Sequence, residues 1–440
     1  MYNDKYVKDY FEIVNKNPKK YYNDYENIQK RVEKSFKDNQ GHLVKYPYQG
    51  LFYSKEEVES FKSISKTLMT ISEKVVKEYI RNPEYRKLFN FDKKLEELIL
   101  IDPGYKTPIP ICRYDMFYKN PEDFMFVEFN TDGTSAMNEE LLVGREIESS
   151  LAMETFKNNY KVKNINTFLP WVDESLNIYR TVSDKKPNIA IVDILNVGTT
   201  ADFLIFRDYY REKGYNCEIC DPRDLTYKNG KLMWKDYSID LVYRRFVALE
   251  FMKYYDEAKD FIAAYKDKAF VMLGSFRTHL LHTKLTFYIL RHRDTLAFLN
   301  EEERTFIEKH IPFTDYLSED ALKELKNNKD DYIIKPFDGY QTSGVYTGVS
   351  LSQNEWEKVL DKAVKEEYIY QKFYKASPLK FINFSSPNKV SLEDYQGVVG
   401  LYIYNGNFVA PYTRIGQDSI IGGKHNYLVA PNIFVEEKSK

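Results

Sequence analysis

Two short segments, ICRYDMFYK (111–119) and FMFVEFN (124–130), carry polar residues between apolar ones. Residues two apart in a strand point to the same face, so Arg113 and Asp115 share one face, as do Glu128 and Asn130. The turn-like NPED (120–123) between them favours an antiparallel hairpin, which would bring these four side chains together. Their oxygens suit Mg²⁺, and an arginine suits a transferring phosphoryl group. The alternative is a set of salt bridges on a solvated sheet face, but the Phe, Val and Ile residues at alternating positions favour a specifically patterned polar face.

A second candidate is the late segment IIKPFDGYQTSGVYTG (333–348). Lys335 lies on a predicted strand, and the polar loop after it contains Gly339, Gly344 and Gly348. Glycines allow a backbone to approach phosphate closely, and backbone N–H groups with a lysine are what a polyphosphate needs. No Gly-Lys-Ser/Thr follows, so this is not a Walker A loop. The alternative is an ordinary hairpin turn with a surface lysine.

Several elements must position these residues. Residues 1–100 are mostly helical, with a capping box formed by Ser54 and Glu57 at the start of the clearest helix. The apolar run 188–195 predicts a strand buried on both faces, followed by a helix that Thr199 and Thr200 cap and Gly214 ends. With a hairpin turn at 229–230 and a strand at 240–246, this predicts a small Rossmann-type unit. The G-x-G-x-x-G fingerprint is missing, so a dinucleotide cofactor is weakly supported.

The pattern after residue 274 is α+β. Helices are predicted near 278–294, 301–309 and 318–327, and a capping box of Ser352 and Glu355 opens another helix. Strands are predicted in DYIIKP, VYTGV and EYIYQKF and near 395–404 and 408–414. The loop between the first two of these strands is the glycine-bearing one.

Composition limits the classes of function. Of 440 residues, 64 are Lys or Arg and 66 are Asp or Glu, and a net charge of -2 argues against a general nucleic-acid binder. The 38 tyrosines could form a base-stacking surface, but AT-rich coding explains their abundance more simply. Three cysteines suit a reducing compartment, and no apolar run or signal-peptide core is evident, so we expect a cytoplasmic protein without a membrane segment. Cys217 and Cys220, like His279 and His282, lack the partners of a zinc site.

The two motifs together resemble the circularly permuted ATP-grasp ligases, in particular the glutathionylspermidine synthase-like family. In that family an Arg-x-Asp strand precedes a Glu-x-Asn strand, and the lysine with its glycine loop comes late in the chain, as RYD (113–115), VEFN (127–130) and IIKPFDGYQTSGVY (333–346) do here. The resemblance plausibly covers residues 100–440 and implies a mixed α+β and α/β fold. Its parts would be a helical region (1–100), an ATP-grasp portion with the metal-ligand hairpin (101–180), a Rossmann-like pre-ATP-grasp unit (181–273) and a nucleotide-binding ATP-grasp portion (274–440).

The resemblance also implies roles for individual residues. Asp115, Glu128 and Asn130 would bind Mg²⁺, and Arg113 would contact phosphate. Lys335, with the loop glycines Gly339 and Gly344, would hold the ATP phosphates. Looser matches place Lys284, on a helix, beside the nucleotide, Gln371 and Lys372 beside the adenine, and Arg414 at the transferring phosphate. The loop GYQTSG is bulkier than a typical glycine-rich lid, and the amidase half of bifunctional members is absent.

The chemistry implied is amide-bond formation through an acylphosphate, with ATP and Mg²⁺ as cofactors and release of ADP. The partners would be a carboxylate and an amine, as small molecules or peptides, free or tethered to a carrier protein. Two alternatives stay open: a nucleotide-binding protein of this fold without turnover, and an ATP-dependent phosphotransferase. A homodimer is the commonest state of such enzymes.

Overall fold

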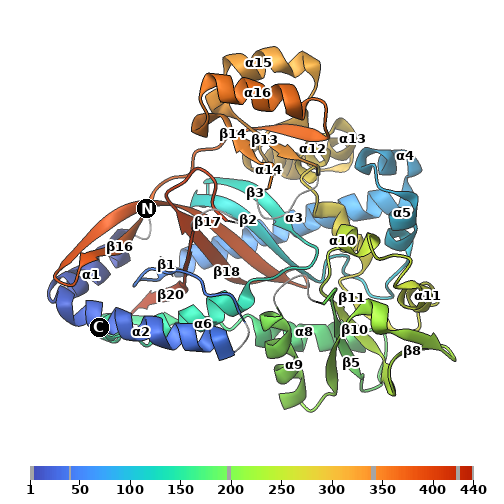
Figure 1. Ribbon diagram of the computed structural model, residues 1–440, viewed down its shortest axis with the longest axis horizontal. Coiled ribbons are helices and arrows are strands. Elements are labelled where there is room, and N and C mark those ends of the chain that lie inside the picture. The colour runs from blue at the N-terminus through green and yellow to red at the C-terminus, as the bar shows by residue number, and fades with distance from the viewer. Residues whose placement is uncertain (1–3, 39–40, 196–199, 338–342, 423–426, 439–440) are drawn as a thin grey trace.

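A computed structural model describes residues 4–38, 41–195, 200–337, 343–422 and 427–438. Its largest sheet has the strand order β19-β18-β17-β2-β3, with β16 paired to β17. The strands are β2 (Ile111–Asn120), β3 (Asp123–Asn130), β16 (Leu379–Ser386), β17 (Lys389–Tyr404), β18 (Asn407–Gly416) and β19 (Leu428–Ala430). The predicted hairpin is confirmed, and the sheet joins it to strands from the C-terminal part of the chain (Figure 1).

A smaller antiparallel sheet forms the lobe at the top of Figure 1. Its order is β12 (Thr314–Tyr316), β15 (Tyr368–Lys372), β13 (Tyr332–Pro336) and β14 (Tyr346–Thr347). The helices α15 (Leu322–Asn327) and α16 (Gln353–Ala363) complete the lobe, and the predicted capping box of Ser352 and Glu355 opens α16. Trp356 is fully buried in the lobe's own small core. The sheet therefore holds Lys335 and Gln371 on two adjacent strands.

The predicted Rossmann-type unit is a four-stranded parallel sheet of order β11-β10-β5-β6. Its strands are β5 (Ile189–Val192), β6 (Cys217–Cys220), β10 (Leu241–Arg244) and β11 (Val271–Leu273), with α8 (Phe168–Arg180) and α9 (Ala201–Glu212) beside them. A meander of β7 (Thr226–Lys228), β8 (Lys231–Trp234) and β9 (Tyr237–Ile239) follows β6. Positive φ at Asn229 and Gly230 confirms the predicted turn between β7 and β8.

The N-terminal part is helical, as predicted, but one strand was not foreseen. Its helices are α1 (Asp4–Asn15), α2 (Pro18–Asp38), α3 (Lys55–Arg81), α4 (Pro83–Arg86) and α5 (Lys93–Leu100). Strand β1 (Leu51–Tyr53) pairs with β20 (Asn432–Glu437), which also pairs with β4 (Tyr160–Lys163). This sheet of β1, β20 and β4 joins the first hundred residues to the C-terminal end. The capping box of Ser54 and Glu57 at α3 is confirmed; Thr200 begins α9 without a side-chain cap, and Thr199 lies outside the described residues.

The single helix predicted over 278–294 is wrong. The chain forms a 3₁₀ helix (Phe276–Leu281), a turn, and the short helices α12 (Thr286–Arg291) and α13 (Arg293–Phe298). The carbonyl oxygen of Thr278 accepts a hydrogen bond from Thr131 Oγ1 at 2.7 Å, and the backbone N–H of His282 bonds to His279 instead. The bond from His282 to His279 spans three residues, as in a 3₁₀ helix, and not the four of an α-helix. Lys284 consequently lies in the turn and not on a helix.

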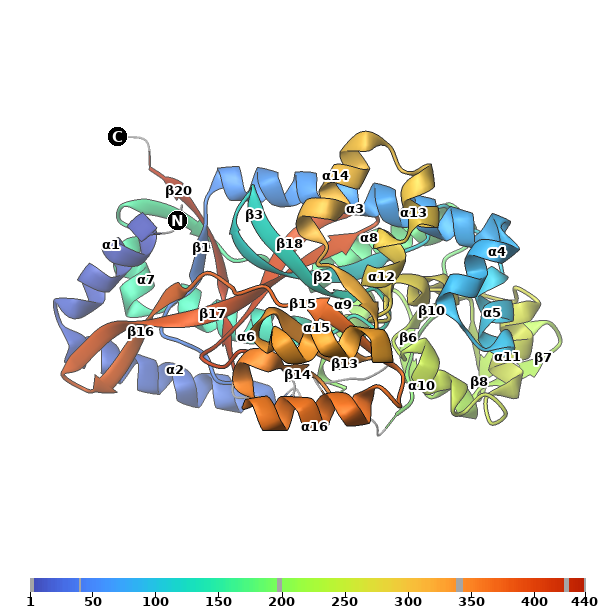
Figure 2. The ribbon, with the colours of Figure 1, turned by 90° about the horizontal axis from the view of Figure 1, so that it is seen from above.

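The remaining helices are α6 (Met137–Glu148), α7 (Leu151–Phe156), α10 (Ala248–Met252), α11 (Lys259–Lys266) and α14 (Glu301–His310). Seen from above, α3 runs along the central sheet (Figure 2). Among the described residues, no helix combines the length and the apolar character that crossing a bilayer requires.

Candidate active site

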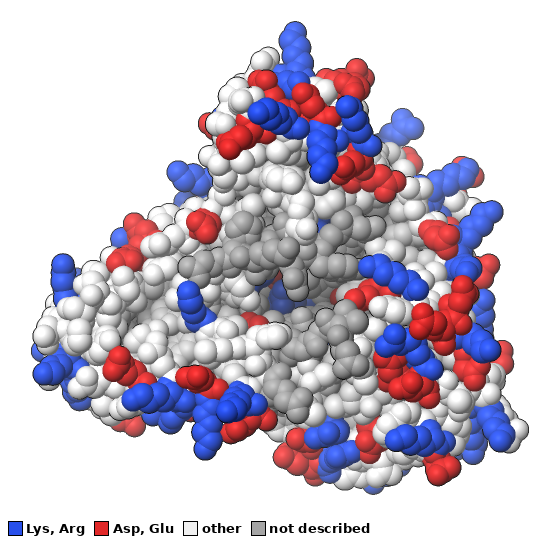
Figure 3. Space-filling model, viewed as in Figure 1, with Lys and Arg blue, Asp and Glu red and all other residues white. Residues whose placement is uncertain are grey.

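The candidate site is a cavity of about 830 Å³ where the central sheet, the small sheet and the Rossmann-type unit meet. Figure 3 shows this face hollowed at its centre, beneath the lobe of α15 and α16. Every predicted site residue among the described ones lines the cavity except Asp115 and Gly344; those that line it are Arg113, Glu128, Asn130, Lys284, Lys335, Gln371, Lys372 and Arg414. Residues three hundred positions apart in sequence thus meet in one place.

Arg113, Asp115 and Arg414 form one connected group at the base of the cavity. The Asp115 carboxylate accepts hydrogen bonds from Arg113 Nε at 2.7 Å and from Arg113 Nη2 at 3.0 Å. Its Oδ2 also accepts from Arg414 Nη2 at 2.7 Å. Asp115 is only 1% exposed, so these charge-assisted bonds are formed out of water and hold both guanidinium groups in place.

Two tyrosine rings and a glycine surround this group. The guanidinium carbon of Arg113 lies 4.9 Å from the ring centroid of Tyr412 and 5.8 Å from that of Tyr402, within the range of cation–π contacts. Gly400 on β17 faces Asp115 across the sheet. A Cβ at Gly400 would lie 2.4 Å from Asp115 Oδ1 and 2.7 Å from Arg113 Cδ, so the pair needs a glycine there.

Glu128 and Asn130 lie on the neighbouring strand, where the sequence placed them. Asn130 Nδ2 donates to Asp115 Oδ2 at 3.2 Å, which leaves the side-chain oxygen Oδ1 of Asn130 for another ligand. Burial raises the pKa of Glu128, but the positive charges of Lys284 and Arg414 outweigh burial and bring it below its ordinary value. Within the described part of the chain, the Glu128 carboxylate has no hydrogen-bonded partner. A negatively charged oxygen pair thus faces the cavity.

Lys335 is the buried lysine of the site, with 7% of its surface exposed. Its Nζ donates to Gln371 Oε1 at 2.8 Å and to the carbonyl of Val127 at 3.4 Å. Burial, assisted by the charge of Lys284, lowers its pKa to about 8. An anion bound beside Lys335 would stabilise its protonated form and raise its pKa.

The remaining predicted nucleotide residues differ in placement. Gln371 is buried and donates from Nε2 to Thr314 Oγ1 at 3.0 Å, so it positions Lys335. The Lys372 ammonium bonds to Asp331 at 3.2 Å and lies over the ring of Tyr332. Gly344 has a φ of +73° and precedes β14. Gly339 lies outside the described residues.

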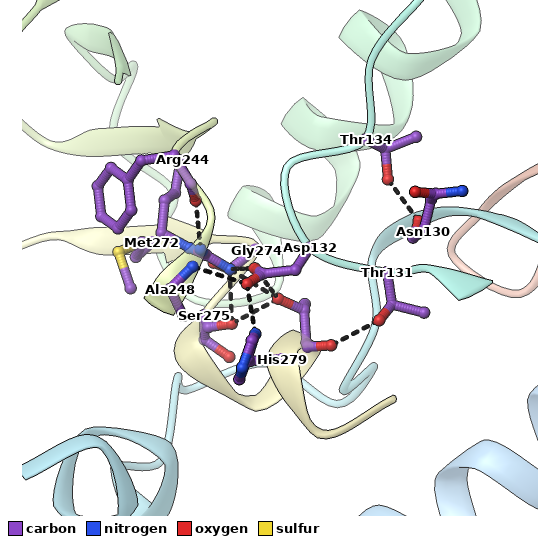
Figure 4. Close-up of polar contacts among 12 residues, drawn as sticks. Asn130, Thr131, Asp132, Thr134, Arg244, Ala248, Met272, Gly274, Ser275 and His279 are labelled. Atoms are coloured by element: carbon purple, nitrogen blue, oxygen red, sulfur yellow. Dashed lines mark hydrogen bonds and ion pairs between the residues drawn. The ribbon is translucent and has the colours of Figure 1, made fainter. Parts of the chain in front are cut away.

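A buried network that the sequence did not reveal joins the segment after β3 to the Rossmann-type unit (Figure 4). The Asp132 carboxylate pairs with Arg244 and accepts from Thr278 Oγ1 at 2.9 Å and Ala248 N at 2.8 Å. Its Oδ2 also bonds to His279 Nδ1 at 2.9 Å. Burial raises the pKa of Asp132, but Arg244 and the histidine bring it far below its ordinary value. The available signal was the charged pair Arg244-Arg245 at the end of the apolar strand β10.

The geometry fits a hydrated divalent cation in part. Glu128 and the carbonyl oxygen of Asn130 are hard donors open to the cavity, whereas the oxygens of Asp115 are engaged by two arginines and Asn130. The described residues contain no cluster of three or more His, Cys, Asp or Glu side chains arranged as a complete metal site. Two protein oxygens beside phosphate-binding cations are what Mg²⁺ uses when substrate phosphates and water complete its shell.

The sequence matches no protein-family model and no curated protein. In structure, the chain is similar to a glutathione synthetase-like effector from Globodera pallida in its apo form. The TM-score is 0.57 at 10% identity, over 92% of this chain and 96% of the other. A protein assigned as a gamma-glutamylcysteine synthetase from Methylobacillus flagellatus KT gives a TM-score of 0.43 at 12% identity, over 84% and 86%. The chain therefore has a mixed α+β fold that is similar to the fold of this glutathione synthetase-like effector.

Proposed function

We propose that this protein is an ATP-dependent carboxylate–amine ligase that forms an amide bond through an acylphosphate. One observation carries the proposal: four cationic side chains from four separate parts of the chain line one cavity together with Glu128. Those cations are Arg113, Lys284, Lys335 and Arg414. This is the charge arrangement that a transferring phosphoryl group requires.

Each residue has a role that its contacts support. Asp115 holds Arg113 and Arg414 side by side, so two guanidinium groups face the same oxygens. Lys335 binds phosphate and is positioned by Gln371. Glu128 and Asn130 would hold Mg²⁺. Bound ATP supplies the phosphoryl group that activates the carboxylate, and Mg²⁺ offsets its charge.

The circular permutation belongs to the same proposal. The metal-ligand strands β2 and β3 precede β13 and β15 in sequence, yet they share a sheet with β17 and β18 from the far end of the chain. Arg113 on β2 and Arg414 on β18 reach the same carboxylate because of this pairing. In a permuted chain, strands from the two ends of the sequence form one sheet, as β2 and β17 do here.

Hydroxylamine tests the proposal without knowledge of the amine. A panel of carboxylic acids and peptides is incubated with the protein, Mg²⁺, ATP and hydroxylamine, and both ADP and hydroxamate are measured. An acylphosphate reacts with hydroxylamine, so the ligase predicts equal amounts of the two products. ADP with no hydroxamate would identify a phosphotransferase instead.

The engagement of Asp115 by both arginines favours a second candidate. A site that keeps its metal-ligand carboxylate paired with cations is also what a nucleotide-binding protein without turnover would have. That candidate predicts binding of Mg²⁺·ATP and no ADP with any acid. The two are separated by the same assay.

A further inference from the structure

The cavity has two ends of opposite charge. One end is lined by Arg113, Lys284, Lys335 and Arg414 together with Glu128. At the other end, the wall formed by the Rossmann-type unit carries Arg245 with the carboxylates of Asp193, Asp202 and Glu250. Glu139 lies between the two ends, where the charges of Arg414 and Arg113 also act on it. The second end therefore favours a cation, whereas the first favours phosphate.

The acidic end coincides with the carboxyl ends of parallel strands. Asp193 directly follows β5 and Arg245 directly follows β10, and the two strands are neighbours in the sheet. From β5 the chain passes through α9 to β6 on one side, and β10 pairs on the other, so the strand order reverses between them. In open α/β sheets this crevice is where ligands bind.

Two of the carboxylates form no ion pair with a described residue, although the charges of Arg245 and Arg244 act on Asp193 from a longer distance. Asp193 accepts only the backbone N–H of Ile194, at 2.8 Å, among the described residues. The Glu250 side chain on α10 has no ion pair in the described part of the chain, and its charge adds to the effect of burial in raising the pKa of Asp193 to about 7. By contrast, Asp202 accepts the N–H of Asn138 at 2.9 Å and lies 3.5 Å from Arg245, and Glu139 accepts from Tyr412.

A buried donor points to the rest of the ligand. The Arg245 side chain is 3% exposed, and its Nη1 donates to the Thr134 carbonyl and to Tyr243 at 3.0 Å. Its buried Nε has no hydrogen-bond partner among the described residues. A buried donor without an acceptor destabilises the folded state, so an acceptor oxygen is expected to bind there.

We infer that this end binds an amine that also carries a carbonyl oxygen, such as the free amino end of a peptide or an amino-acid amide. The ammonium group lies against Asp193 and Glu250, and the carbonyl oxygen accepts from Arg245 Nε. The excess of carboxylates selects against a second acidic group nearby. The inference rests on the proposed ligase function and assigns its amine subsite.

Glycinamide is the probe because it combines an ammonium group with a carbonyl oxygen, and acetamide lacks only the ammonium. Binding of each to the full chain is measured by saturation-transfer NMR, and Mg²⁺·ATP binding is measured separately by calorimetry. The test variants are Asp193→Asn and Glu250→Gln. Glu212→Gln, exposed at the end of α9, makes the same change of charge outside the cavity.

Glycinamide is expected to bind the wild type and acetamide is not. Each test variant should weaken glycinamide binding about tenfold, as expected for loss of a charged partner, while Glu212→Gln and Mg²⁺·ATP binding are unchanged. Absence of glycinamide binding, or equal binding by all three variants, overturns the amine subsite. Absence of Mg²⁺·ATP binding in the wild type overturns the ligase proposal instead, so the two failures are distinct.

Discussion

Glu128 lines the phosphate-binding end of the cavity, where the charges of Lys284 and Arg414 lower its pKa. Glu128→Gln keeps its size and removes the charge that Lys284 and Arg414 stabilise. We expect ADP release to fall below detection, while the unfolding temperature changes little because Glu128 has no hydrogen-bonded partner among the described residues. Steady-state ADP assays and thermal unfolding measure the two effects. Glu122→Gln in the exposed turn of the same hairpin is the control, and normal turnover of Glu128→Gln would contradict the metal assignment.

Lys335 illustrates a conflict between stability and function. Its pKa is about 8 in the folded protein and near 10.5 when the chain is unfolded, so its charge disfavours folding. That cost is fully present below pH 8 and disappears as the pH rises through 10.5. Lys335→Met should therefore stabilise the protein at pH 7, by about 1–3 kcal/mol, with no gain above pH 10.5.

Urea unfolding at pH 7 measures the effect of Lys335→Met. The matched control is Lys372→Met on the adjacent strand β15, because the Lys372 side chain is 45% exposed and its charge stays in contact with water. Its effect on the free energy of unfolding should stay within about 0.5 kcal/mol. A loss of stability in Lys335→Met larger than that of the control would show that its bond to Gln371 outweighs its desolvation.

At the scale of elements, the close packing of β17 on β2 fixes the arginine pair. Gly400→Ala places a methyl group against Asp115 and Arg113 without removing any polar group. We expect at least about tenfold weaker Mg²⁺·ATP binding by calorimetry, because the guanidinium groups must move. Gly397→Ala, on the same strand but facing the flexible end of Leu379, should bind normally. Equal binding by both variants would mean that the position of the arginines is unimportant.

The network around Asp132 couples the segment after β3 to the Rossmann-type unit. Asp132→Asn leaves Arg244 buried without its counter-ion, at a cost of about 3–5 kcal/mol. The pKa of Asp132 is lowered in the folded state, so its stabilisation is present above pH 4 and declines as the pH falls below it. Urea unfolding should show the loss at pH 7 and a smaller difference from wild type near pH 3. Asp102→Asn, an exposed control, should cost little.

Local patterns predicted much of this architecture. The hairpin, the capping boxes of Ser54 and Ser352 and the turn at Asn229 depend on residues close in sequence, and all are present. The pairing of β1 with β20 joins residues almost four hundred positions apart through three-residue contacts, which leave no periodic signal. The break in the predicted helix at 278–294 lies where Thr278 contacts Thr131, a residue 147 positions away that the local pattern does not include.

The residues of the candidate site also fall into those that the sequence predicted and those that only the folded structure brings together. Arg113, Asp115, Glu128 and Lys335 could be found because strand periodicity and the order of two motifs identify them. The partners of Asp132, and the crevice with Asp193 and Arg245, arise only when the Rossmann-type unit packs against the hairpin. Sequence periodicity describes one element at a time, so a site made by three units stays hidden until they are placed.

At the scale of the whole molecule, the central claim is that the cavity between the three units binds Mg²⁺·ATP. Thermal unfolding of the wild type, Lys335→Met and Glu128→Gln, each with and without Mg²⁺ and ATP, tests it most directly. The account predicts a rise in the wild-type unfolding temperature that needs both Mg²⁺ and ATP and is lost in both variants. No rise at saturating ATP, or an equal rise in all three proteins, would contradict it.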